Sequence, residues 1–158
     1  MILTKKDKGG KSHMEKVDGY SITVPIPKNK DLSVDLFSSR LTKLLNAKAK
    51  LLKKAFNSDT VGFEIKDDKV TFKWLDGDAS PELIQATMKF VTAVVKLIST
   101  GQSVKCKERE LHSEKYAMRC FLVRLGFVGN EYKLDRKLLM KNLTGSSAFR
   151  LKDGAGND

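Results

Sequence analysis

The sequence contains few of the residues that supply disulfides, metal ligands or catalytic bases. Its 158 residues include two cysteines and two histidines. Two cysteines are too few for a disulfide framework, and no metal-ligand spacing surrounds Cys106 or Cys120. We therefore expect two reduced thiols, and we expect neither a metal nor any other cofactor.

Histidine gives no basis for acid–base or nucleophilic catalysis. His13 belongs to a Ser-His-Met triplet that resembles the remnant of an expression vector, and His112 lies in a charged connector. A Cys-His pair would require His112 to converge with Cys106 or Cys120, and nothing in the spacing favours that. A glycine-rich nucleotide loop is also missing. We therefore expect the protein not to be an enzyme.

Long hydrophobic runs are absent as well. No apolar run approaches the roughly 20 residues of a membrane span, and residues 1–11 lack the apolar core of a signal peptide. These absences predict a cytoplasmic protein with no membrane partner. The length and the apolar fraction of 41% suit one domain. We expect this domain to span residues 17–151, between a disordered basic tail at 1–16 and a disordered tail at 152–158.

Positive charge is what the sequence has in excess. The net charge is +11, and its distribution is uneven. Residues 61–100 carry five basic and six acidic side chains, whereas the remainder carries 25 basic and 13 acidic ones. The excess therefore lies on both sides of a near-neutral centre. Such a balance favours polyanionic partners, namely nucleic acid, an acidic protein surface or an anionic membrane, although lysine-rich faces can also be simply solvated.

Hydrophobic periodicity predicts one strand and one long helix in the first part of the chain. Apolar and polar residues alternate from Tyr20 to Ile26, which predicts a half-buried strand. Pro25 and Pro27 place this strand at a sheet edge or end it. A helix with a continuous apolar stripe is predicted over residues 33–56. Lys48 falls within that stripe, where it either snorkels past its neighbours or meets a buried carboxylate.

A hairpin and a second helix follow. Alternation over residues 61–65 and 70–74 predicts two antiparallel strands around a turn at Lys66–Lys69. The same alternation places Trp74 on the apolar face, against a helix predicted over residues 80–99. That helix begins with a Ser-Pro pair, and its wide apolar surface predicts that it is the most buried helix.

Two helices joined by a tight turn are predicted over residues 113–144. Ser113 supplies an N-cap and Gly126 a left-handed C-cap for the first helix. Asn130 caps the second helix, and Gly145 ends it. The predicted apolar stripe of the second helix consists of Leu134, Leu138, Leu139 and Leu143.

Two helices around a glycine-containing turn are also the pattern of a helix-turn-helix, and the fit is poor. The small residue expected four positions before Gly126 is Leu122, and the buried position late in the second helix is Asp135. A plain helical hairpin packed on the core is therefore the expectation. Together the elements predict an α+β fold, with a three-stranded antiparallel sheet packed on helices and a C-terminal helical hairpin, in the order βαββααα.

The C-terminal part of the chain resembles a known family. The segments that carry the resemblance are Glu114–Ala117, Phe121–Lys133, Arg136-Lys137 and Ser146–Arg150, and the likeness extends back to about Val17. Together they are similar to the signature of the virulence-related proteins, which occur on conjugative transposons and other mobile elements of Gram-positive gut bacteria. The resemblance implies a mobile genetic element as the setting, and it supplies no catalytic residues.

The candidate binding site consists of basic side chains that lie off the apolar stripes of two helices. They are Arg40, Lys43, Lys50 and Lys54 on one helix, and Lys133, Arg136, Lys137 and Lys141 on the other. Two such helices around one site would contact phosphates, and no group of Asn, Gln or Arg is spaced for reading base edges. Tyr116, Tyr132 and Phe149 could stack on bases, although core or capping positions suit them better.

Two functions fit a chain with an excess of positive charge and no recognisable catalytic residues. The first is a non-enzymatic accessory protein of a mobile element that binds a polyanion, either DNA or RNA. The alternative is an inhibitor or adaptor that binds a host protein or nucleoprotein, such as an antagonist of a nuclease-based defence system. Because acidic side chains are the usual mimics of nucleic acid, a basic inhibitor would engage bound nucleic acid or an acidic patch. The oligomeric state stays open.

Overall fold

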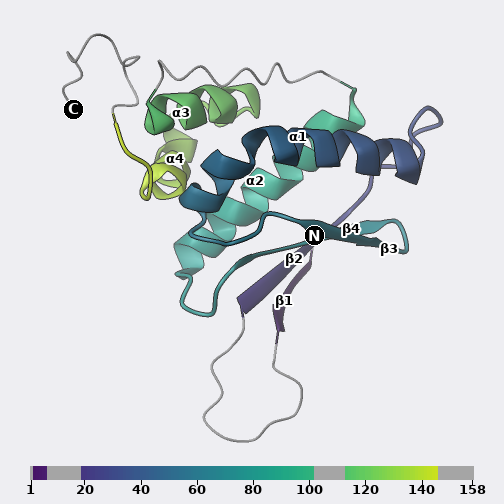
Figure 1. Ribbon diagram of the computed structural model, residues 1–158, viewed down its shortest axis with the longest axis horizontal. Coiled ribbons are helices and arrows are strands. Elements are labelled where there is room, and N and C mark those ends of the chain that lie inside the picture. Colours follow the sequence, from purple (N-terminus) through teal and green to yellow (C-terminus); the bar gives the residue numbers. More distant parts are fainter. Residues whose placement is uncertain (1, 7–18, 102–112, 146–158) are drawn as a thin grey trace, which may run out of the picture.

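The computed structural model describes residues 2–6, 19–101 and 113–145 and has an α+β fold (Figure 1). Its elements are, in chain order, β1 (Ile2–Lys6), β2 (Gly19–Pro25), α1 (Val34–Ala55), β3 (Phe63–Lys66), β4 (Lys69–Leu75), α2 (Pro81–Ser99), α3 (Glu114–Arg124), the short 3₁₀ helix η1 (Asn130–Tyr132) and α4 (Lys133–Met140). From β2 onwards, the predicted order of strands and helices is confirmed.

The sheet is antiparallel, with strand order β1-β2-β4-β3. The three predicted strands pair as expected, and β1 adds a fourth. The prediction that residues 1–16 are disordered is therefore wrong for Ile2–Lys6, while residues 7–16 and 152–158 lie outside the described ranges. Because β1 covers one side of β2, β2 is an interior strand. Pro25 is its last residue, so proline ends the strand and does not mark a sheet edge.

The core lies between the sheet and the helices, which gather on one side of it (Figure 1). α2 buries nine of its 19 residues, a larger share than α1, α3 or α4, as predicted. Trp74 is 3% exposed and packs in an aromatic cluster, with ring centroids 5.1 Å from Phe72, 5.2 Å from Phe56 and 6.3 Å from Phe90 of α2. The predicted burial of Trp74 against α2 is confirmed.

Serine begins each of the three longer helices. The hydroxyls of Ser33, Ser80 and Ser113 accept hydrogen bonds from the backbone N–H three residues later, at 3.0, 3.1 and 3.0 Å. Each bond satisfies one of the free amides in the first helical turn. An acidic residue, Asp35, Glu82 or Glu114, also lies in each first turn, where it complements the helix dipole.

Gly126 ends α3 through a Schellman motif, which confirms its predicted role. Its φ is +96°, and its N–H donates to the carbonyl of Val123 at 3.0 Å. The N–H of Phe127 donates to the carbonyl of Leu122 at 2.9 Å. These two bonds satisfy carbonyls that the last helical turn leaves free, and the left-handed residue between them favours glycine.

Replacing Gly126 with valine is expected to destabilise the protein through the backbone alone. No atom lies within 4 Å of the position that a Cβ would occupy at Gly126, so no clash contributes. The left-handed conformation costs an L-residue about 1–2 kcal/mol, and β-branching adds to this. Each kcal/mol corresponds to about 2–4 °C in Tm for a protein of this size.

The matched control for this change is Gly62→Val. Gly62 also has open space around its Cβ position, and its φ is not left-handed. Thermal unfolding followed by circular dichroism should show a lower Tm for Gly126→Val than for the control. Equal Tm values for the two variants would contradict the assignment of Gly126 as the helix terminus.

The second helix of the C-terminal pair differs from the prediction in three ways. Asn130 is the first residue of the 3₁₀ helix η1 and is not its N-cap, because Gly129, with φ of +97° and no side chain, occupies that position. α4 ends at Met140, so Gly145 does not end it. Leu134 is 54% exposed, whereas Asp135 is buried. Asp135 and Leu139, four residues apart, form the buried side of α4, and Asp135 pairs with Lys89 of α2, so Leu134 lies outside that side.

Candidate nucleic-acid interface

The predicted cations of α1 divide into two kinds. Lys43 and Lys50 are exposed and form no ion pair with a described residue. Arg40 is half-buried, and its Nη1 donates to the carbonyl oxygen of Ile98 at 3.2 Å. That carbonyl belongs to the last turn of α2 and also accepts from the N–H of Gly101 at 3.2 Å, so Arg40 adds a second partner at the helix end. Arg40 therefore fastens the end of α2 to α1, and its assignment as a free surface cation is wrong.

The predicted cations of α4 divide in the same way. Lys133, Lys137 and Lys141 are exposed. Arg136 is half-buried, and its Nη1 donates to the carbonyl oxygens of Phe127 and Gly129, both at 3.0 Å. Both carbonyls belong to the turn between α3 and η1. Arg136 therefore stabilises that turn and does not project from an exposed flank as predicted.

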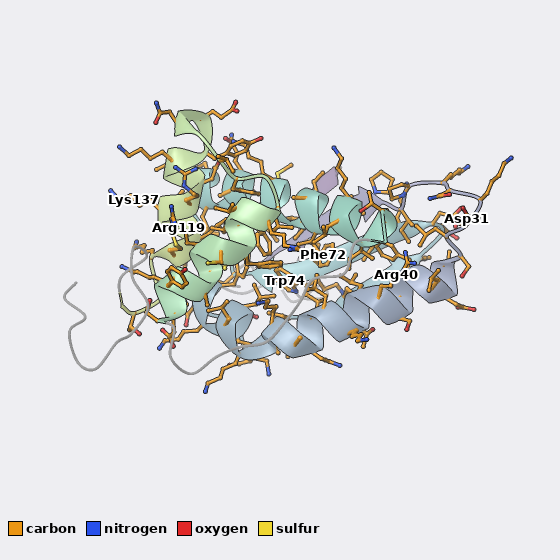
Figure 2. All side chains as sticks on the ribbon, turned by 90° about the horizontal axis from the view of Figure 1, so that it is seen from above. Asp31, Arg40, Phe72, Trp74, Arg119 and Lys137 are labelled. Carbon is orange, nitrogen blue, oxygen red and sulfur yellow. The ribbon has the colours of Figure 1, made fainter. Side chains whose placement is uncertain are left out.

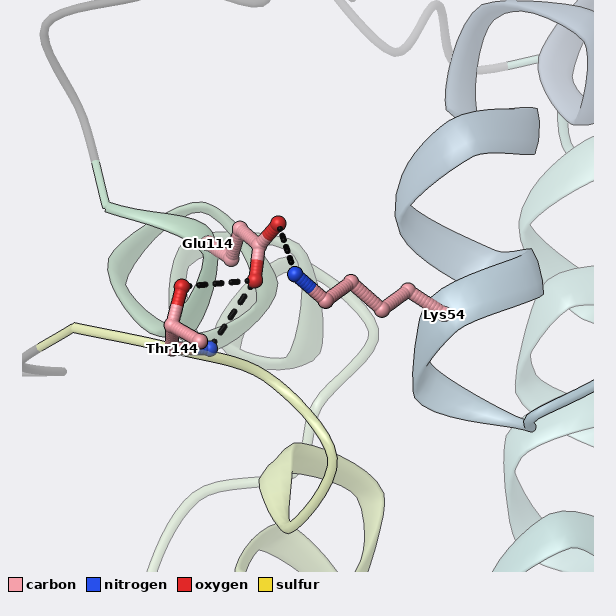
Figure 3. Close-up of polar contacts among 3 residues, drawn as sticks. All are labelled: Lys54, Glu114 and Thr144. Atoms are coloured by element: carbon pink, nitrogen blue, oxygen red, sulfur yellow. Dashed lines mark hydrogen bonds and ion pairs between the residues drawn. The ribbon is translucent and has the colours of Figure 1, made fainter.

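Three segments that are distant in the sequence meet at what we call the helix junction, formed by Lys54, Ala55, Glu114, Asn142 and Thr144. The Lys54 Nζ donates to Glu114 Oε2 at 2.8 Å, and the N–H and hydroxyl of Thr144 both donate to Glu114 Oε1 at 2.9 Å (Figure 3). The Asn142 Nδ2 donates to the carbonyl of Ala55 at 3.0 Å. These bonds hold the end of α1, the start of α3 and the segment after α4 together.

The carboxyl of Glu114 at the helix junction is stabilised in its charged form. Its partial burial acts to raise the pKa, but the hydrogen bonds from Lys54 and from the N–H and hydroxyl of Thr144 outweigh that effect. The pKa of Glu114 therefore lies below its ordinary value. A carboxyl whose pKa is lower in the folded than in the unfolded chain stabilises the fold above the unfolded pKa, and this contribution is lost as the pH falls through the folded pKa.

Glu114→Gln is therefore expected to destabilise the protein in a pH-dependent manner. The loss of the charged hydrogen bonds should lower the free energy of unfolding by up to about 1 kcal/mol at neutral pH, since the group is partly exposed. The difference in Tm between wild type and variant should shrink as the pH falls below about 4, the ordinary range of a glutamate pKa. Glu131→Gln, at an exposed position, is the control. A Tm difference that stays constant from pH 7 to pH 3 would contradict the role of the Glu114 charge.

The segments that meet at the helix junction, together with α4, carry six basic side chains, and we call these the basic cluster. They are Lys53, Lys54, Lys115, Arg119, Lys137 and Lys141. The cluster draws on α1, α3 and α4 and their ends. Figure 2 shows Arg119 and Lys137 at the end of the molecule formed by α3 and α4, whereas Arg40 and Asp31 lie toward the opposite end.

Contacts at the helix junction position the members of the cluster. The N–H of Lys115 donates to the carbonyl of Thr144 at 3.1 Å, and Arg119 lies one helical turn further along α3. Lys141 directly precedes Asn142, which contacts α1. Lys53, Lys115 and Arg119 were not among the predicted site residues. The four-residue spacing of Lys115 and Arg119 was a visible signal, but their proximity to α1 depends on tertiary contacts.

Two further lysines make specific contacts with other elements, Lys48 from a buried position and Lys89 from an exposed one. Lys48 is 8% exposed, and its Nζ lies 5.3 Å from the centroid of the Phe121 ring, a cation–π contact. Of the two alternatives for Lys48, a carboxylate partner is not found among the described residues. The Lys89 Nζ lies 2.9 Å from Asp135 Oδ2, which explains how α4 buries an acid.

A groove of about 510 Å³ runs between the second half of α2 and the α3–α4 turn. Lys89, Lys96 and Arg124 contribute to its lining, beside the ring of Tyr132. That ring packs against Phe127 at 5.0 Å between centroids and lies under the Lys89 Nζ at 5.7 Å. Tyr132 therefore has a packing role, as expected. Tyr116 is half-buried.

Several sequence predictions fall outside the described ranges, including those for His13, Cys106, His112 and Phe149. Cys120 is exposed. Among the described residues, no group of three His, Cys, Asp or Glu side chains gathers as a metal site requires. None of the described helices is both long enough and apolar enough to cross a membrane. The chain matches no protein-family model, no curated protein and no solved structure.

Proposed function

We propose that the protein is a non-enzymatic nucleic-acid-binding protein that contacts phosphates through the basic cluster. The observation that carries this proposal is that three separate segments, each with basic side chains, are held together at the helix junction. Lys54 is partly neutralised by Glu114, whereas Lys53, Lys137 and Lys141 are exposed and form no ion pair with a described residue. Such cations attract a polyanion and gain from the release of its counterions.

Lys43 and Lys50 extend this surface along α1. With a rise of 1.5 Å per residue, Lys43 lies roughly 16 Å from Lys54 along the helix axis. Phosphates of one nucleic-acid strand or duplex recur over such distances, so a single backbone could contact α1 and the basic cluster together. Because these side chains are mainly flexible lysines, we infer contact with the phosphate backbone and little recognition of base edges. A mobile genetic element remains the proposed setting, on the resemblance described above.

Salt-dependent binding tests the proposal. Fluorescence anisotropy with labelled random-sequence duplex DNA, single-stranded DNA and RNA should show binding at low salt with similar affinities across sequences. The logarithm of the binding constant should fall linearly with the logarithm of salt concentration, by about 0.9 per neutralised duplex phosphate. Comparing the three probes identifies the preferred nucleic acid. If none of them binds even at low salt, the proposal is wrong.

A further inference from the structure

One edge of the sheet is open at β3. Among the described residues, the strand order β1-β2-β4-β3 leaves β3 paired on one side only, with β4. Lys66 and Lys69 face each other across a two-residue turn, and such a pair exchanges backbone hydrogen bonds. Along antiparallel strands, hydrogen-bonded pairs alternate with pairs whose N–H and C=O groups point outward. Phe63 and Ile65 therefore turn their N–H and C=O groups away from β4. An edge of this kind can pair with an additional strand.

A groove lies beside this edge, between β3 and α1. Its volume is about 460 Å³. Val61, Gly62, Phe63 and Ile65 line it on the strand side, and Ser38, Thr42, Leu45 and Asn46 line it on the helix side. Phe63 and Ile65 are half-buried, so the groove offers apolar surface next to the free backbone groups.

The helix side of the groove carries a regular row of polar side chains. Ser38, Thr42 and Asn46 recur every four residues along α1, and none of them forms a hydrogen bond with a described residue. Four helical residues advance by about 6 Å, close to the roughly 6.6 Å between alternate side chains of a strand. A strand in the groove would therefore place successive inward side chains beside successive members of this row.

We propose that the β3 edge and this face of α1 bind an extended, acidic segment of a partner protein as an added strand. The main-chain groups of Phe63 and Ile65 would give affinity, and the groove would select side chains. Lys50 and Lys53, both exposed, lie one and two turns beyond Asn46 and supply the complementary charge. A second copy of this chain is a poorer occupant, because it also carries a net charge of +11.

This inference extends beyond nucleic-acid binding, and peptide selection tests it. Random peptides of about twelve residues, long enough for one strand, are displayed on phage and selected against the immobilised full-length chain. Acidic peptides should be enriched on this chain relative to a parallel selection on an unrelated immobilised protein. Labelled synthetic versions of the enriched peptides should bind the Thr42→Trp and Asn46→Trp variants about tenfold or more weakly than the wild-type protein. Both substitutions fill the groove at exposed positions.

Ser39→Trp is the matched control, since Ser39 is exposed on α1 outside the groove. Peptide binding should be unchanged in Ser39→Trp and in the double variant Lys137→Glu with Lys141→Glu. Nucleic-acid binding should in turn be unchanged in Thr42→Trp. Each proposal can therefore fail without the other. Bound peptide should also slow hydrogen exchange at the amides of Phe63 and Ile65. The proposal is overturned if no peptide is enriched, if Thr42→Trp binds as tightly as wild type, or if the chain dimerises through this edge.

Discussion

Trp74→Ala is expected to lower the free energy of unfolding by about 3–5 kcal/mol, the range for removing a large aromatic side chain from a core. Trp74 is 3% exposed and contacts the rings of Phe56 directly after α1, Phe72 of β4 and Phe90 of α2, so its removal leaves a cavity in the aromatic cluster. It also removes the donor that reaches the carbonyl of Gly62 at 2.9 Å. Since domains are typically stable by about 5–15 kcal/mol, such a loss would leave the fold marginal.

Denaturant unfolding measured by circular dichroism checks this expectation. Trp74→Phe is the control, because it keeps an aromatic ring and removes only the N–H donor and part of the volume. Its cost should be smaller, about 0.5–1.5 kcal/mol for one lost hydrogen bond, because the Gly62 carbonyl belongs to an exposed residue. The chain has a single tryptophan, so the wild-type fluorescence reports on this site alone. A spectrum typical of a water-exposed indole in the folded protein would contradict the packing.

Reversing Lys137 and Lys141 together to glutamate is expected to weaken nucleic-acid binding about tenfold or more at low salt, since two phosphate contacts become repulsions. Both side chains are exposed and form no ion pair with a described residue, so the fold should be retained, with a cost of about 0.3–1 kcal/mol from a carboxylate in the last turn of α4. The salt dependence should become shallower by roughly one unit of slope for each lost contact. Lys43→Glu with Lys50→Glu should act in the same direction.

The control is a double reversal elsewhere on the surface. Lys28 and Lys30 are exposed in the loop that contains Asp31, which Figure 2 shows toward the end of the molecule away from Lys137. Reversing these two changes the net charge by the same amount. Equal losses of affinity for the two double variants would mean that binding responds to total charge and that the basic cluster is not the site.

The fold was largely predictable because its elements carry strong local signals. Strand alternation, serine caps and the positive φ of Gly126 are set by neighbouring residues, and these predictions hold. The strand β1 was missed because a short polar segment gains its stability from pairing with β2, which local composition does not reveal. The exposure of Leu134 was missed because α4 buries Asp135 through its ion pair with Lys89, a tertiary contact that periodicity does not reveal.

The candidate site was predictable only in part. Helical periodicity separates exposed from buried positions, so Lys43, Lys50 and Lys137 were placed on the surface correctly. Periodicity carries no information about which carbonyl or carboxylate lies opposite on another element. Arg40 and Arg136 bind backbone carbonyls, which a planar guanidinium with several donors does well. Their roles could not be separated from those of free cations without the tertiary structure.

The bonds between Glu114 and Thr144 affect how the protein folds and opens. They join the first turn of α3 to a residue 30 positions later, so that turn is complete only when the segment after α4 has docked. The α3–α4 pair and the end of α1 should therefore open as one cooperative unit. Because Lys54, Lys115 and Lys141 belong to this unit, their spacing is fixed before any ligand arrives. Preorganisation of this kind lowers the conformational entropy that binding would otherwise remove.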